Sequence, residues 1–442
     1  MNHSALKTAF LLALTGLATI ILFNVTADLL RFGSENPLHT DFYKFHLSAV
    51  SHVEGESPYW ANPNRPDRLI HCWAGFDPDL DRRDFPILTG IHPGMQQCLH
   101  PNLNPPIFVA LTLPLALVDF DLAWQLWTIF SALAGMLAIA LLAKTLGWLD
   151  HPGGWAMTAF LVLALQLYFP AVANLQLGQV TNWLLLPLVL CWTALRRNRL
   201  MKGAFFLGLL LAIKPFFGLL LPGLLILRQW RVLGWSIAFA VMISLIGAAI
   251  IGAEPSLEYI ALMREVTWLG SNWNASAPGF FHRLLASPEY GGYLDQPGLA
   301  RALSLAFSLG MAGWILFVLR SQSKSKSPEA CMDWLFTLAL PLMLLLSPLG
   351  WMYYLPLVYL SGALLLHWSP AADRRLTGLL LMLAIVLTAF PTILVSGLRL
   401  GELPERLLQD SLYFYVLLGY TFLVFRITRN SRIQDASEGK AK

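Results

Sequence analysis

Asp41 is an acidic residue placed where an enzyme could use it. It opens the polar segment 41–46, shortly after the first apolar run of the sequence. A carboxylate at that place would lie at the edge of a bilayer and could act as a general base, which must come within hydrogen-bond reach of the hydroxyl it activates. The structural alternative is that Asp41 only complements the dipole at the start of a helix.

Lys214 is the only cation in the apolar stretch 203–227. Charged residues within apolar membrane segments are functional candidates because burying them is costly. A lysine ammonium there could bind a phosphate group as a point charge. The structural alternative is a lysine that extends its head group to the membrane surface.

A second set of polar and aromatic residues could contact a substrate. Amide side chains can hydrogen-bond sugar hydroxyls, but they also cap helices, and aromatic residues also form belts at membrane surfaces. The segment 274–276 matches a glycosylation sequon as well. These weaker candidates are Asn104, Gln179, Asn182, Asn272, Asn274, His282, Trp351 and Tyr353.

Metal and cysteine patterns add one expectation. The acidic cluster in 77–84 lacks the glycine and closing glutamate of a calcium loop, and the cysteines lack metal-site spacing. We therefore predict no metal site and no cofactor. Cys72 and Cys98 share one polar loop, and we predict a disulfide between them if that loop faces an oxidising compartment.

Composition places these residues in a membrane protein. The chain has 442 residues, of which 56% are hydrophobic and 13% charged, whereas soluble domains carry about 25% charged residues. The apolar run near the N-terminus is long and lacks a clean cleavage site, so we interpret it as a retained first helix. We predict a single all-α domain over 1–442 in the cell (inner) membrane.

The apolar segments predict about twelve transmembrane helices, some of them short. A helix hairpin is expected at Lys214-Pro215, because proline disfavours helix at the preceding residue. The predicted spans are 8–27, 122–143, 155–172, 183–195, 203–213, 216–227, 232–252, 299–319, 331–346, 355–368, 376–396 and 410–426.

Charge alternation gives these spans an orientation. With both termini in the cytoplasm, the cluster 196–202 and the basic tail 427–442 lie inside, as the positive-inside rule favours. The apolar segment 105–118 then cannot cross, and residues 28–121 form the first extracytoplasmic loop. The apolar spacing within 41–54 predicts a short helix lying on the membrane surface.

The chain resembles glycosyltransferase family 87 of the GT-C superfamily, over about 41–354. The similarity depends on the order and spacing of several short motifs rather than on any one of them. These are Asp41 with Gly55-x-x-Pro58-Tyr59, Asn104-Pro105-Pro106, Leu177-Gly178-Gln179, Gly203 through Lys214-Pro215, and Ser347-Pro348 with Trp351.

The resemblance implies a multi-pass helical enzyme that takes a monosaccharide from a polyprenyl-phosphate donor. Mannose is the best family-level choice, with arabinofuranose next, and the acceptor would be a lipid or glycan on the extracytoplasmic face. Asp41 matches the catalytic acidic residue and Lys214 the Lys-Pro element near the donor phosphate. One departure is Tyr353, which occupies a place where the family often has histidine; His282 could supply an imidazole instead.

Two other functions remain open at this point. A transporter or flippase of polyprenyl-linked sugars would place polar groups near the membrane midplane, and convergence of Asp41 and Lys214 on one outward cavity would argue against it. A structural role in glycan assembly would be favoured if the long loop packed away from the bilayer. The expected partners are the lipid donor, the acceptor and membrane lipids, with no nucleic acid.

Overall fold

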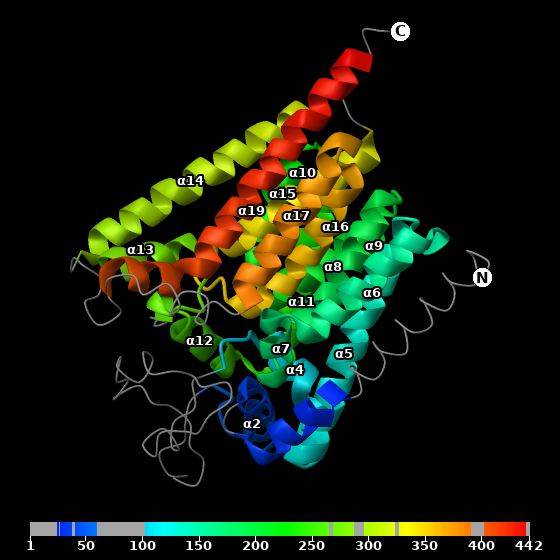
Figure 1. Ribbon diagram of the computed structural model, residues 1–442. Helices are drawn as coiled ribbons and strands as arrows, with labels where there is room; N and C mark the ends of the chain where they lie inside the picture. The colour runs from blue at the N-terminus through cyan, green and yellow to red at the C-terminus, as the bar shows by residue number, and fades with distance from the viewer. Residues whose placement is uncertain are drawn as a thin grey trace.

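The computed structural model describes residues 24–25, 27–37, 40–59, 102–264, 268–286, 296–322, 327–389 and 402–438. Every regular element within these ranges is a helix (Figure 1), with one isolated β-bridge between Asn274 and Trp351. The predicted all-helical class is therefore confirmed.

Five described helices are long and apolar enough to cross a membrane. A sixth span is possible if α6 (Pro152–Leu167) and α7 (Phe169–Gln176), bent by 53°, cross together. The five are α5 (Phe120–Thr145), α11 (Trp230–Ile251), α14 (Pro297–Gln322), α15 (Pro328–Leu346) and the segment Asp410–Thr428 of α19 (Glu402–Glu438).

The predicted number of about twelve spans is thus not reached among the described residues. Several predicted spans form helices that are shorter than the roughly 20 residues needed to cross, and the predicted span 8–27 lies outside the described residues. The shorter elements are α8 (Thr181–Arg196), α9 (Leu200–Ile213), η4 (Pro215–Leu219), α10 (Leu220–Ile226), η6 (Met352–Leu357) and α16 (Val358–Trp368), while α17 (Ala371–Ala389) covers most of the span predicted at 376–396.

The break predicted at Lys214-Pro215 is present. α9 ends at Ile213, Lys214 has the extended dihedrals φ −139° and ψ 102°, and Pro215 begins η4. Beyond the break, α10 packs mainly against α11, α14 and α15. The chain therefore turns where proline dictates, but the second arm joins a different part of the bundle instead of pairing with α9.

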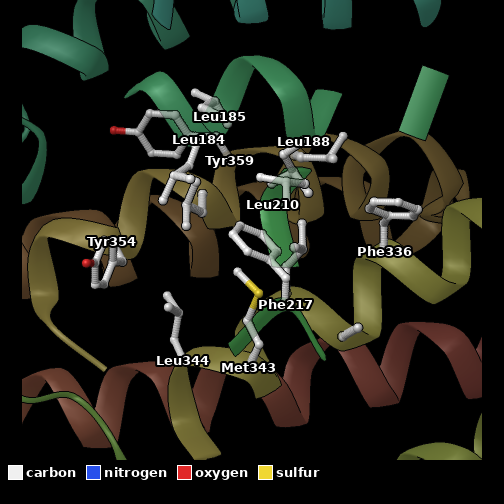
Figure 2. Packing of buried hydrophobic residues seen from close by; sticks show 14 of the residues in the cluster. Leu184, Leu185, Leu188, Leu210, Phe217, Phe336, Met343, Leu344, Tyr354 and Tyr359 are labelled. Carbon is white, nitrogen blue, oxygen red and sulfur yellow. The ribbon is translucent and has the colours of Figure 1, made fainter. Parts of the chain in front are cut away.

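A central apolar cluster fixes the position of this break. Phe217 of η4 is fully buried and lies among Leu188 of α8, Leu210 of α9 and Met343 of α15 (Figure 2). Side chains in a close-packed protein interior resist displacement. The cluster therefore holds the backbone beside Lys214 in one place.

A buried ion pair joins helices at the far end of α8. Arg196 Nη1 lies 2.8 Å from Asp333 Oδ2, and the indole nitrogens of Trp192 and Trp368 donate to the same carboxylate at 2.7 and 3.1 Å. A buried charge is costly unless it is paired and hydrogen-bonded. These contacts satisfy Asp333 and connect α8, α15 and α16.

A group of short helices covers one end of the bundle. α2 (Asp41–Val53), α4 (Pro106–Thr112), η2 (Leu113–Leu117) and α12 (Ala253–Leu262) lie at the end opposite the C-terminus (Figure 1). α4 approaches α11 so closely that a Cβ added at Gly247 would come 2.5 Å from Ile107 Cα. The stretch Pro106–Leu117 is too short to span, in agreement with its predicted placement.

The predicted helix at 41–54 is present as α2, and most of its apolar face is buried against the protein, with only Val53 exposed. Phe42 and Ala49 are fully buried, and the Phe42 ring stacks on Trp127 with 5.2 Å between centroids. Phe45 lies edge-on to Phe108 at 5.0 Å. Most of the apolar face therefore packs on α4 and α5, which fixes α2 against the protein, and its predicted place at the membrane surface stays a prediction.

Candidate functional site

Asp41 lies in the first turn of α2, where two side chains contact its carboxylate. Thr40 is the N-cap and accepts the backbone N–H of Tyr43 through its side chain. Lys44 Nζ lies 2.5 Å from Asp41 Oδ1, and Gln179 Nε2 donates to Asp41 Oδ2. Thr40 therefore caps α2, and the Asp41 carboxylate is held by Lys44 and Gln179.

The turn after α7 brings Gln179 to Asp41 through backbone contacts. The Phe42 N–H donates to the Leu177 carbonyl at 3.0 Å, and Trp127 Nε1 donates to the Gly178 carbonyl at 2.8 Å. Gly178 has φ +65°, and a Cβ there would lie 2.5 Å from Phe42 Cβ. The close approach of this turn to α2 therefore requires glycine, for both conformation and space.

Replacing Gly178 should disturb the site more than the fold. We expect Gly178→Ala to push α2 away from the turn and lower activity by about tenfold or more, since small misplacements of catalytic groups are costly. Gly55→Ala is the matched control, because Gly55 also has positive φ but no atom lies within 4 Å of its added Cβ. Equal activities of the two variants, measured alongside their thermal stabilities, would contradict this role for the turn.

Lys214 comes to the same site from the break between α9 and η4. Its ammonium lies over the Tyr354 ring, 5.7 Å from the centroid. The pKa of Lys214 is lowered to about 7, mainly by desolvation and in addition by the charge of Lys44, while the charge of Asp41 acts in the opposite direction. The two residues singled out from the sequence, Asp41 and Lys214, are therefore electrostatically coupled although they lie far apart in the chain.

Tyr353 and Tyr354 form an aromatic wall beside these charges. Their rings meet at 4.9 Å, and Trp351 stacks on Tyr353 at 6.1 Å. Burial, together with the charge of Asp41, raises the pKa of both phenols well above the usual range. Both hydroxyls therefore stay protonated, and that of Tyr354 points away from the apolar cluster (Figure 2).

Asn274 holds the segment that contains these aromatic residues. Its side-chain oxygen accepts from the N–H groups of Ser276 and Gly350 at 3.1 and 3.0 Å, and its nitrogen donates to the carbonyls of Leu269 and Pro348 at 3.0 and 2.9 Å. With its polar atoms used and its side chain fully buried, Asn274 is structural and inaccessible as a glycosylation sequon. Asn272 is exposed nearby.

Asn104 and Asn182 are also buried within the structure. The carbonyl of Asn104 accepts from the Tyr59 hydroxyl at 3.0 Å, which joins the Gly55–Tyr59 and Asn104–Pro106 motifs. Asn182 lies in the first turn of α8 against α5, where a Cβ at Gly135 would be 3.1 Å from its Cγ. Both asparagines lie in elements around the site, and the side-chain oxygen of each is buried without a hydrogen-bond partner among the described residues.

His282 belongs to a different charged group. It lies on α13 (Ala277–Leu285), where burial and the charges of Arg283 and Arg301 lower its pKa. Arg283 is buried and donates from Nη1 to the carbonyls of Ser271 and Asn274 at 2.6 and 3.1 Å. The imidazole is therefore placed with arginines of α13 and α14, whereas Tyr353 lies within electrostatic reach of Asp41.

Two further predictions concern metals and cysteines. Among the described residues, no group of three or more histidines, cysteines or acids could hold a metal ion. Cys72, Cys98 and the acidic cluster 77–84 lie outside the described residues. Cys191 and Cys331 are buried thiols that form no disulfide among the described residues.

Sequence reasoning did not single out Lys44 or Tyr354 as site residues. Lys44 follows Asp41 by three residues, a spacing that places both side chains on one face of a helix. Tyr354 follows Tyr353, and no sequence motif distinguishes it as a separate site residue. Contact between Gln179 and Asp41 was also not predicted, because it depends on how α7 and α8 meet α2.

Comparison with known proteins gives one match. The sequence model of "Glycosyltransferase family 87" matches residues 102–348, which is more than half of the chain. Gln179 and Lys214 lie within the matched region, whereas Asp41 and Tyr353 lie outside it. Neither the curated proteins nor the solved structures contain a match.

Proposed function

The chain is a member of glycosyltransferase family 87, and from that premise we propose that it transfers a monosaccharide from a polyprenyl-phosphate donor to a lipid or glycan acceptor. In this proposal Asp41 is the general base and Lys214 binds the donor phosphate. The bundle has a GT-C architecture in the cell membrane, and the end that carries α2 faces the extracytoplasmic side.

The observation that carries the proposal is the convergence of Asp41, Lys214 and Tyr354. Lys214 contacts the Tyr354 ring, and the charge of Asp41 acts on both residues. An acid and a cation in one partly enclosed site can act at two ends of a reacting group, the base on the incoming hydroxyl and the cation on the leaving oxygen.

The proposed reaction is a single displacement with inversion at the anomeric carbon. The acceptor oxygen forms a bond to that carbon as the carbon–oxygen bond to phosphate breaks. The acceptor proton passes to Asp41, and the electron pair of the broken bond stays on the phosphate oxygen. Lys214 stabilises the charge that develops there, and Gln179 keeps the Asp41 carboxylate in place.

The arrangement favours transfer over transport without chemistry. A flippase for the same lipid needs polar groups that accompany the head group across the bilayer. Here the charged groups around Asp41 lie where α2 covers one end of the bundle (Figure 1). At the other end of α8, Arg196 pairs with the buried Asp333. The charges of Asp41, Lys44 and Lys214 are therefore grouped apart from that pair, and no continuous row of charges connects the two groups along α8.

The sugar is proposed as mannose, and a donor panel tests both the class and the sugar. Purified protein in sealed proteoliposomes is given polyprenyl-phosphate mannose, arabinofuranose or glucose with a membrane lipid extract as acceptor. We expect transfer from the mannose donor with release of one polyprenyl phosphate per bond formed. Lipid translocation without transfer from any donor, or use of nucleotide sugars alone, would refute the proposal.

A further inference from the structure

We infer that Lys44 is a second phosphate-binding cation, which moves from Asp41 to the leaving phosphate as the sugar is transferred. This inference rests on the proposed function. It assigns a role to a residue outside the region that matches the family, and it explains why a general base is paired with a lysine before substrate binds.

The geometry places Lys44 beside Asp41 and within electrostatic reach of Lys214. Its ammonium lies 2.5 Å from Asp41 Oδ1, and its charge also acts on Lys214. Only 16% of the Lys44 side chain is exposed, so the ammonium is held within the site and does not extend freely into solvent. A lysine side chain has a flexible four-carbon stem, which allows a short movement without any shift of α2.

Charge balance gives the movement a physical reason. Before transfer, with both lysines protonated, Asp41, Lys44 and Lys214 carry a net charge of about +1, which matches the single negative charge of a phosphodiester donor. The reaction protonates Asp41 and converts the donor to a phosphate monoester with a charge of about −2 near neutral pH. Asp41, Lys44 and Lys214 then carry a net charge of about +2. This charge balances that of the phosphate monoester when both ammonium groups face it.

The protonation of Asp41 therefore removes the partner of Lys44 just as a new negative charge forms nearby. An ammonium beside a neutral carboxylic acid loses most of its electrostatic attraction to it. The phosphate monoester becomes the stronger partner, and Lys44 shares its charge with Lys214. In this scheme the attraction between Lys44 and the phosphate grows as charge develops on the leaving oxygen, so it is stronger in the transition state than in the ground state, which is the condition for lowering the barrier.

The test compares how tightly the donor and the phosphate product bind. For Lys44→Gln we expect the KM for the donor to change by less than about threefold. The inhibition constant of undecaprenyl phosphate should rise by about tenfold or more, and kcat should fall by about ten- to a hundredfold. Lys44→Arg should recover much of both losses because the charge is restored. Lys144→Gln, which removes an exposed lysine at the end of α5, should leave all three values unchanged.

Two results would overturn the inference. One is an unchanged kcat and product inhibition constant in Lys44→Gln. The other is equal weakening of donor and product, which is the result expected if Lys44 only attracts anions or maintains the fold. Wild-type protein that transfers no sugar would instead refute the proposed function, so the two failures are distinguishable.

Discussion

Asp41→Asn should abolish most of the activity while leaving the protein folded. Asparagine keeps the size of the side chain and can still accept from Gln179, but it cannot take a proton at neutral pH. Loss of a general base costs about a hundredfold to ten-thousandfold in rate. The measurement is kcat with the preferred donor, together with the thermal stability of the purified variant.

The structure explains why folding should survive this change. Thr40, not Asp41, caps α2, and a partly exposed ion pair such as Asp41–Lys44 contributes only about 0–1 kcal/mol. Asp28→Asn is the matched control, since Asp28 is exposed. An Asp41→Asn enzyme with near wild-type kcat would place the base elsewhere.

Lys214→Met should impair donor use by about a hundredfold or more in kcat/KM, because a cation that stabilises a developing oxyanion is lost. The methionine side chain fills a similar volume against Tyr354, so the aromatic wall should remain packed. Lys202→Met, at an exposed position on α9, is the control. Normal use of the donor by Lys214→Met would refute the phosphate assignment.

The lowered pKa of Lys214 adds a pH dependence to this prediction. With a pKa of about 7, the ammonium loses its proton as the pH rises through that value, so donor binding should weaken from about pH 7 to 9. Lys214→Arg stays charged throughout this range, and its KM for the donor should vary less with pH. A pH profile of KM that is the same for both proteins would show that Lys214 does not titrate at the site.

Much of the architecture could be predicted from local patterns. Apolar runs indicate helices because a buried helix must be apolar along its length, and Pro215 predicts the break after Lys214 from steric constraints alone. The number of crossings could not be obtained in this way. Broken helices such as α6 with α7 depend on packing against neighbours, which hydropathy does not report.

The candidate site was partly predictable for similar reasons. Lys214 stands out because charge is costly in an apolar setting, and Asp41 because it opens a polar segment shortly after the first apolar run, so each can be recognised singly. The residues that contact them cannot be recognised in this way, because the contact of Gln179 with Asp41 depends on the packing of Gly178 against Phe42. Asn274 and Asn182 resemble sugar-binding amides in the sequence, and only the structure shows that both are buried and that Asn274 hydrogen-bonds the neighbouring backbone.

The most direct test of the central claim is the structure of the protein in nanodiscs with a non-transferable polyprenyl-phosphate sugar. Cryo-electron microscopy should place the phosphate against Lys214 and Tyr354, with the anomeric carbon of the sugar directed toward Asp41. A phosphate bound instead at the Arg283 and Arg301 group, with Lys214 and Asp41 facing no part of the donor, would contradict the account.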